Sequence, residues 1–148
     1  MYSAGLRNPY TGNEGYAFVS YAHADGRRAA VYVDILQQAG CRLWFDLGIE
    51  PGEEWPEVIA QSLRHADACL VFLSEKSLVS RHVRKEISYA LTTDVPLVCV
   101  YLEECRLTPG MHLQLDMSPS VDLGKMMSPV DGAGHILELL PETVWREQ

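Results

Sequence analysis

One carboxylate stands among basic side chains in the stretch SRHVRKEISYAL, residues 80–91. This carboxylate belongs to Glu86, and the neighbouring basic residues are Arg81, His82, Arg84 and Lys85. On a helix with about 100° between successive residues, Glu86 lies at the border of the apolar stripe, where a side chain can face a cleft. The basic neighbours predict that its ionised form is favoured, and an ionised carboxylate can accept hydrogen bonds from hydroxyl groups and stabilise developing positive charge.

The same pattern has two plainer interpretations. A glutamate among arginines and lysines commonly lies on a solvated helix face, where each ion pair is worth about 0.3–0.5 kcal/mol. His82 and Glu86 also have the spacing of two metal ligands on one helix, but the sequence shows no third ligand, so we predict no metal site. The choice between a solvated face and a functional carboxylate depends on where the fold places this helix.

The helix that carries Glu86 follows the third of four short apolar runs that we predict to be strands. These runs are residues 16–22, 41–46, 68–74 and 96–103, and residues 120–123 form a short fifth strand. One helix is predicted after the first run, with Asp25 as its expected cap. Further helices are predicted at residues 56–66, 80–91 and 133–140. Residues 105–119 are expected to be irregular. Apolar strands that alternate with amphipathic helices predict an α/β fold: a flavodoxin-like three-layer domain with a central parallel sheet of about five strands flanked by helices.

Ligands of such sheets bind beyond the carboxyl ends of the strands. The loop LGIEPGEEW, residues 47–55, lies at this edge, and its length and position favour a functional loop over a plain connection. Trp55 at the entry of the next helix is equally consistent with packing and with ligand contact, whereas Trp44 within a strand is expected in the core.

Composition restricts the classes of function. The 148 residues, 47% of them hydrophobic and 22% charged, fit one domain, and we assign residues 1–15 to a flexible N-terminal tail and residues 16–148 to the domain. A formal net charge of −8 argues against binding to nucleic acid or to a membrane surface. The sequence shows no signal peptide and no apolar run near the roughly 18 residues of a membrane span, so we expect a cytoplasmic protein. The cysteines form no CxxC pair and are expected to be reduced core residues: Cys41, Cys69, Cys99 and Cys105.

Two other uses of a flavodoxin-like sheet are disfavoured by the strand ends. The turn SYAHADG after the first strand has neither GxGxxG nor GxxxxGK[ST], which argues against a dinucleotide-binding Rossmann domain or a phosphate-binding loop. A phosphate-accepting receiver domain has an acidic cluster after the first strand and an aspartate at the end of the third. Here these places hold Ser20-Tyr21 and Ser74.

Three segments together resemble a Toll/interleukin-1 receptor (TIR) domain of the bacterial kind. They are YAFVSYAHAD, LQQAGCRLWFDLGIEPGEEW and ADACLVFLSEKSLVSRHVRKEISYAL, and the resemblance runs from about Tyr16 to the end of the chain. It implies a self-association loop at the cleft that supports head-to-tail homo-oligomers with other TIR domains. This loop consists of Leu47, Gly48, Ile49, Glu50, Pro51, Gly52, Glu53 and Glu54.

The resemblance also implies an activity, because many TIR domains hydrolyse or cyclise NAD+. Glu86 stands at the position of their catalytic glutamate, which holds the hydroxyls of the nicotinamide-bearing ribose and stabilises the oxocarbenium-like state. NAD+ is then the substrate, no further cofactor is implied, and the product is either ADP-ribose or a cyclic isomer. The residues that match family positions binding substrate or supporting the cleft are Ser20, Tyr21, Asp46 and His82. Trp55 and Ser80 are further substrate-binding candidates because of their positions at the same edge.

Several of these residues have structural alternatives. Ser20 and Asp46 suit turns, Tyr21 suits packing, and Ser80 suits a helix cap. His82 departs from the family pattern, because active members often carry tryptophan at this place.

Our first hypothesis is an NAD+ glycohydrolase or cyclase in bacterial immune signalling, or an NAD-depleting effector, with further domains in a longer protein. The alternatives are a noncatalytic TIR adaptor that acts by association, and a nucleoside deoxyribosyltransferase, which would exchange bases on deoxynucleosides.

Overall fold

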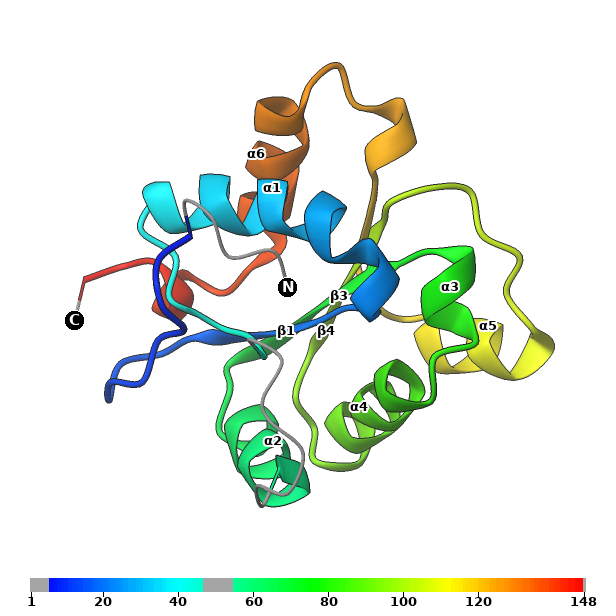
Figure 1. The fold of residues 1–148 in the computed structure, drawn as a ribbon, viewed down its shortest axis with the longest axis horizontal. Coiled ribbons are helices and arrows are strands. Elements are labelled where there is room, and N and C mark those ends of the chain that lie inside the picture. Colours follow the sequence, from blue (N-terminus) through cyan, green and yellow to red (C-terminus); the bar gives the residue numbers. More distant parts are fainter. Residues whose placement is uncertain (1–5, 47–54, 148) are drawn as a thin grey trace.

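The computed structural model describes residues 6–46 and 55–147, apart from the side chain of Trp55. Five parallel strands form one sheet in the order β2-β1-β3-β4-β5 (Figure 1). They are β1 (Ala17–Ser20), β2 (Leu43–Trp44), β3 (Ala68–Leu73), β4 (Leu97–Tyr101) and β5 (Ser120–Asp122). The predicted parallel sheet of about five strands is confirmed.

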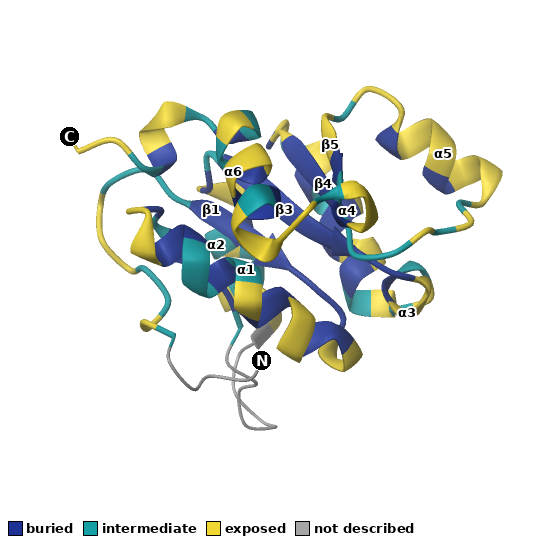
Figure 2. Cartoon of the chain, turned by 90° about the horizontal axis from the view of Figure 1, so that it is seen from above, coloured by how far each residue is buried: buried dark blue, intermediate teal, exposed yellow. Residues whose placement is uncertain are grey.

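Helices cover both faces of the sheet, so the domain has three layers (Figure 1). One face carries α1 (Gly26–Gln38) and α6 (Pro129–Leu139), and the other carries α2 (Trp55–Arg64), α4 (Arg81–Thr92) and α5 (Pro109–Leu115). Alternate residues of β3 serve the two layers, because Leu70 and Phe72 pack with the first set and Cys69 and Val71 with the second. The strands are accordingly buried along most of their length (Figure 2).

Short helical segments complete the connections. They are η1 (His23–Asp25), α3 (Glu75–Leu78), η2 (Leu123–Lys125) and η3 (Glu142–Val144). The prediction that residues 105–119 are irregular is wrong, because α5 lies within them. Thr108 caps α5 by accepting a hydrogen bond from the Met111 amide at 3.2 Å, Pro109 occupies its first position, and Met111 and Leu115 are buried.

Asp25 occupies the N-cap position of α1, as predicted, but its side chain makes no capping hydrogen bond. It is 2% exposed, and its carboxylate accepts hydrogen bonds from Ser74 Oγ at 2.5 Å and from Arg28 Nη2 at 2.8 Å. The network continues because Arg28 also pairs with Glu103 at 2.8 Å. Glu103 in turn accepts a hydrogen bond from the backbone amide of Glu75 at 3.2 Å. These contacts join the turns that follow β1, β3 and β4.

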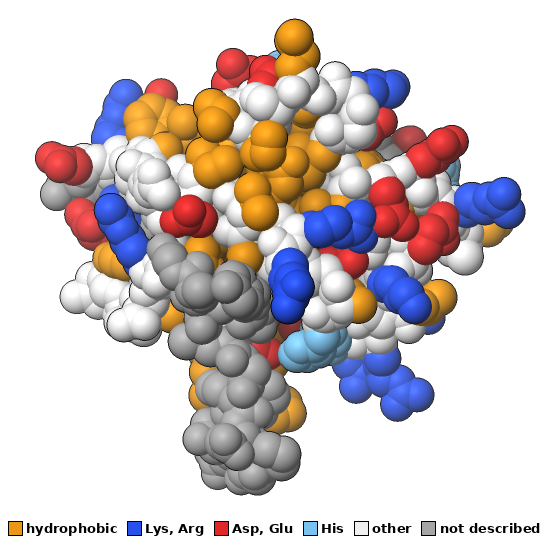
Figure 3. Space-filling view, turned by 45° about the horizontal axis from the view of Figure 1, so that its top comes forward, with side chains coloured by type: hydrophobic (Ala, Val, Ile, Leu, Met, Phe, Trp, Pro, Cys, Tyr) orange, Lys and Arg blue, Asp and Glu red, His pale blue; other side chains and the backbone are white. Residues whose placement is uncertain are grey.

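The described part of the N-terminal segment contacts the domain. The Tyr10 amide donates to the Leu43 carbonyl at 2.9 Å, and the side-chain amide of Gln37 exchanges hydrogen bonds with the backbone of Arg7. Hydrophobic side chains also gather on the face that α1 and α6 form (Figure 3). Val31 of α1 and Val130 of α6 are exposed.

All four cysteines are free thiols, and three of them, Cys41, Cys69 and Cys99, are buried. This agrees with the prediction of reduced cysteines, although Cys105 is only half-buried. Within residues 6–46 and 55–147, the helices are too short or too polar to cross a membrane.

Candidate functional site

Helix α4 presents Glu86 at the carboxyl edge of the sheet. Ser80 caps the helix, because its Oγ accepts a hydrogen bond from the Val83 amide at 3.4 Å. Val83 and Ile87 are fully buried against the sheet, and the basic residues of the same helix, Arg81, Arg84 and Lys85, are exposed. Glu86 lies between these two faces with 9% of its surface exposed, as the helical spacing predicts.

The Glu86 carboxylate is held by the last residue of β1. Ser20 Oγ donates a hydrogen bond to Glu86 Oε1 at 2.6 Å, and Ser20 itself is 1% exposed. Among the described residues, Glu86 Oε2 has no hydrogen-bond partner. One carboxylate oxygen is therefore fixed by the protein, and the other can accept a hydrogen bond from a ligand.

Burial raises the pKa of Glu86 to about 7. The hydrogen bond from Ser20 and the nearby His82 act against this rise in pKa, and the charge of Asp46 adds to it. His82, one of the basic neighbours, favours the ionised form as expected, but burial outweighs it, so the expected net preference for the ionised form is wrong. The neighbouring cations point into water, whereas the carboxyl group lies in the interior, so desolvation dominates its pKa. Both protonation states of Glu86 are populated near neutral pH.

The ring of His82 is anchored at both nitrogens. Nε2 lies 2.9 Å from the Tyr21 carbonyl oxygen, and Nδ1 lies 3.0 Å from Ser80 Oγ. Since a carbonyl oxygen can only accept, we assign the proton to Nε2, and in the neutral ring Nδ1 then accepts from the Ser80 hydroxyl. The ring of His23 lies beside it, with 5.1 Å between the centroids. His82 thus ties α4 to the turn that follows β1.

Tyr21 joins the ends of β1 and β2. Its hydroxyl donates to the Asp46 backbone carbonyl at 2.7 Å, and the side chain is 4% exposed. Desolvation raises the pKa of the Tyr21 hydroxyl well above its usual range, and the charges of Asp46 and Glu86 add to this rise. Tyr21 therefore supports the site as a neutral hydrogen-bond donor.

A cleft of about 490 Å³ opens between α2 and α4. Its polar end is lined by His23, Asp46, His82 and Glu86. Its apolar wall is formed by α2, through Pro56, Ile59, Ala60 and Leu63, and Tyr89 of α4 lies opposite in the lining. A cleft of this volume with one polar end and one apolar wall is typical of a small-molecule site.

The structure brings together five of the residues singled out in the sequence. Glu86, Asp46 and His82 line the cleft, Ser20 holds Glu86, and Tyr21 supports Asp46 and His82. Two further assignments remain less direct. Ser80 caps α4 and contacts His82, and Trp55 begins α2 but its side chain lies outside the described residues. The proposed self-association loop, residues 47–54, also lies outside them.

No role for the apolar wall of the cleft was predicted from the sequence. Ile59 and Leu63 are four residues apart on α2, so they lie on one helix face. His23 and Tyr89 were also left without a role. Among residues 6–46 and 55–147, no group of three or more His, Cys, Asp or Glu side chains could hold a metal ion.

A family profile described as TIR domain matches residues 17–136. No curated protein sequence matches the chain.

Three solved structures are similar to the protein. The first is the crystal structure of the TIR domain of the Toll-related receptor TRR-2 from Hydra magnipapillata, with 16% identity, a TM-score of 0.64, and coverage of 83% of this chain and 96% of that one. The TIR domains of the activated Roq1 resistosome recognising the pathogen effector XopQ match with 14% identity, a TM-score of 0.48, and coverage of 59% and 57%. A conserved protein from Enterococcus faecalis V583 matches with 15% identity, a TM-score of 0.49, and coverage of 86% and 89%. At 16% identity and a TM-score of 0.64, the likeness to the Hydra receptor domain concerns the fold alone.

Proposed function

The chain belongs to the TIR domain family, and on this premise we propose that it cleaves the bond between nicotinamide and ribose in NAD+, as a glycohydrolase or a cyclase. The observation that carries the proposal is the placement of Glu86. It lines a cleft of small-molecule size with one oxygen held by Ser20. The second oxygen has no partner among the described residues and is available to a substrate hydroxyl.

The chemistry needs positioning and electrostatics more than strong acid catalysis. When the bond between C1′ and the nicotinamide nitrogen breaks, its electron pair goes to nicotinamide, which leaves as a neutral group. The positive charge passes to the ribose as an oxocarbenium-like species, which a nearby carboxylate stabilises. Water then adds to C1′ and releases one proton to give ADP-ribose, or an adenine nitrogen of the same molecule attacks C1′ to give a cyclic product.

The residues of the cleft have distinct roles in this proposal. Glu86 in its ionised form accepts hydrogen bonds from the ribose hydroxyls, and Ser20 fixes its orientation. Ile59 and Leu63 on the wall and Tyr89 opposite give the flat nicotinamide ring an apolar contact surface. This wall also lowers the local dielectric constant, which strengthens the interaction between the carboxylate and the developing positive charge.

The biological setting belongs to the same proposal. A cytoplasmic TIR enzyme of this kind would serve immune signalling, or would act as an effector that depletes NAD+. Head-to-tail association of several copies through residues 47–54 would complete the cleft of one subunit with the loop of the next. Activity per molecule is then expected to rise with protein concentration, and strictly proportional activity down to dilute protein contradicts this part.

The second candidate is a noncatalytic scaffold that acts by association with other TIR domains. The observation that favours it concerns His82, which stands where active members often carry tryptophan. Both ring nitrogens of His82 are engaged with the protein, which restricts the ring's movement toward a ligand.

Nicotinamide release from NAD+ by concentrated protein tests the proposal. Glu86→Gln keeps the size of the side chain but removes the charge, and we expect it to lower the rate at least about 100-fold. Glu138→Gln on the exposed face of α6 is the matched control and keeps the rate. Separation of the products distinguishes ADP-ribose from a cyclic isomer. Release that persists in Glu86→Gln refutes the assigned site, and no release even under crowding favours the scaffold.

A further inference from the structure

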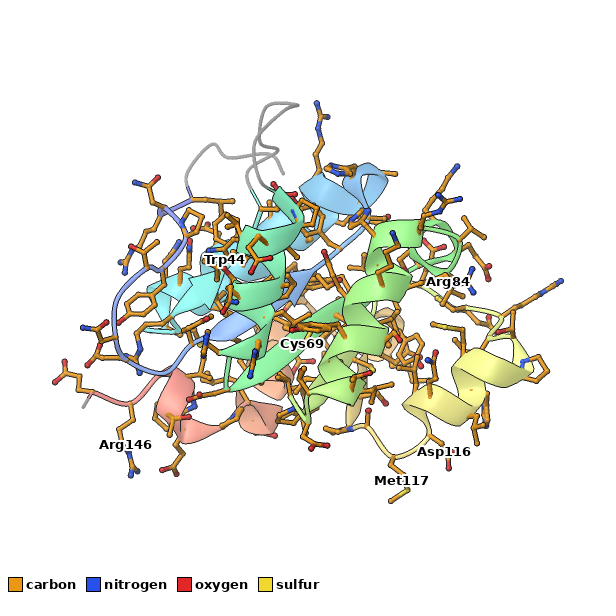
Figure 4. All side chains as sticks on the ribbon, turned by 90° about the horizontal axis from the view of Figure 1, so that it is seen from below. Trp44, Cys69, Arg84, Asp116, Met117 and Arg146 are labelled. Carbon is orange, nitrogen blue, oxygen red and sulfur yellow. The ribbon has the colours of Figure 1, made fainter. Side chains whose placement is uncertain are left out.

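A second hollow lies on the other side of α4 from the cleft. Helix α4 lies between α2 and α5 (Figure 4), and the cleft opens on the α2 side. The hollow measures about 300 Å³ and is lined by Arg81, Arg84, Lys85 and Ser88 of α4 and by Gln114 of α5. Lys85 lines both the hollow and the cleft, so it connects the two.

The hollow concentrates positive charge in an acidic chain. The protein has 20 Asp and Glu residues but only 12 Lys and Arg residues. Several arginines elsewhere are paired, as Arg28 is with Asp25 and Glu103. By contrast, Arg81, Arg84 and Lys85 are exposed and form no ion pair with any residue of the described ranges. Within the described ranges, this group of cations is therefore not compensated by an acidic partner.

Local electrostatics make this arrangement unfavourable for the helix alone. Arg81 is the first residue of α4, and the first turn holds no acidic residue. Cations near a helix N-terminus oppose the helix dipole, and the like charges of Arg81 and Lys85 are spaced i and i+4, which is also destabilising. A bound anion would relieve both effects.

The side chains indicate which anion would fit. Arginine binds phosphate through two parallel N–H donors, and lysine adds a point charge. Ser88 and Gln114 add neutral groups that can donate hydrogen bonds to further oxygens. A compact, multiply charged phosphate group therefore matches the lining better than a single carboxylate.

We propose that Arg84 and Lys85, with Arg81, bind the diphosphate of the dinucleotide whose nicotinamide-bearing ribose lies at Glu86. This inference rests on the proposed function for the identity of the ligand. In NAD+ the diphosphate is attached to the 5′ carbon of that ribose, so it must lie close beside the group that contacts Glu86. Lys85 precedes Glu86 in the chain and projects about 100° away around the helix, from the cleft toward the hollow.

Calorimetric titration with ADP-ribose tests the diphosphate site without requiring cleavage. We expect Arg84→Gln and Lys85→Met each to raise the Kd for ADP-ribose about tenfold, since each removes charge-assisted hydrogen bonds. Arg64→Gln is the matched control, because Arg64 is an exposed cation at the far end of α2, and it should change the Kd less than about twofold. Binding of nicotinamide riboside, which has no phosphate, should not weaken in any of these variants.

Parallel assays of nicotinamide release separate the two proposals. If Arg84→Gln and Lys85→Met weaken ADP-ribose binding while the wild-type protein releases no nicotinamide, the diphosphate site stands and the proposed reaction fails. If nicotinamide is released but the Kd for ADP-ribose and the KM for NAD+ do not change in these variants, the reaction stands and the diphosphate site is refuted. The site is also refuted if the wild-type protein does not bind ADP-ribose, or if the variants weaken nicotinamide riboside binding equally.

Discussion

Replacing Glu86 with glutamine should stabilise the protein at alkaline pH and leave its stability at acid pH nearly unchanged. Burial raises the pKa of Glu86 from its ordinary value of 4.5 to about 7. Below about pH 4.5 the carboxyl group is protonated in the folded and the unfolded chain. Between 4.5 and 7 the unfolded chain loses this proton while the folded protein keeps it, so the wild-type protein loses stability as pH rises.

The size of this effect follows from the pKa. A rise from 4.5 to about 7 corresponds to about 3 kcal/mol of unfolding free energy, fully lost above about pH 8. Glu86→Gln is uncharged at every pH and does not incur this loss. For a domain of this size, about 3 kcal/mol corresponds to a difference in Tm of roughly 6–12 °C.

Thermal and urea unfolding at pH 4.5, 6, 7 and 8.5 would measure the difference between the two proteins. We expect the difference in unfolding free energy to grow by about 3 kcal/mol in favour of Glu86→Gln across this range. Glu138→Gln, on an exposed face, should show no such growth. Parallel stability curves for the wild-type protein and Glu86→Gln would refute the argument that desolvation controls this carboxyl group.

Three further substitutions test other contacts. Ser20→Ala removes a hydrogen bond that lowers the pKa of Glu86, so the pH midpoint of nicotinamide release should move upward. An unchanged midpoint in the pH profile of the rate would contradict this. Asp25→Ala leaves the buried Ser74 hydroxyl without its acceptor and should cost about 2 kcal/mol in urea unfolding; a cost below about 0.5 kcal/mol would show that the pair is not needed. His82→Phe removes the donor to a backbone carbonyl and should cost about 1 kcal/mol in the same assay, whereas equal stability would contradict this role.

The alternation of apolar runs and amphipathic helices was sufficient to predict the sheet and the position of Glu86. Strand β3 is apolar along its length because helices cover both of its faces, and such a run is visible in sequence. Helical spacing placed Glu86 correctly at the border between buried and exposed residues, because it depends only on the angle between successive side chains.

Features that depend on distant partners were not predictable in this way. The effect of burial on the pKa of Glu86 was misjudged because cations adjacent in sequence project from other sides of the helix. The side chain of Asp25 was expected to cap α1. Its partner is instead Ser74, which lies 49 positions away in the chain, and a local sequence pattern does not reveal such a contact. Helix α5 was missed because only two of its residues, Met111 and Leu115, are buried, which leaves a weak periodic signal.

The network around Asp25 couples the local unfolding of three turns at the carboxyl edge of the sheet. Asp25 after β1 bonds Ser74 after β3 directly and is linked to Glu103 after β4 through Arg28. None of these turns can therefore separate from the sheet without breaking contacts of the others. Amide hydrogen exchange in the three turns should therefore proceed as one cooperative unit with a shared opening free energy. A local opening at His23, at the polar end of the cleft, would then also open the start of α3. A ligand enclosed in the cleft would stabilise all three turns together.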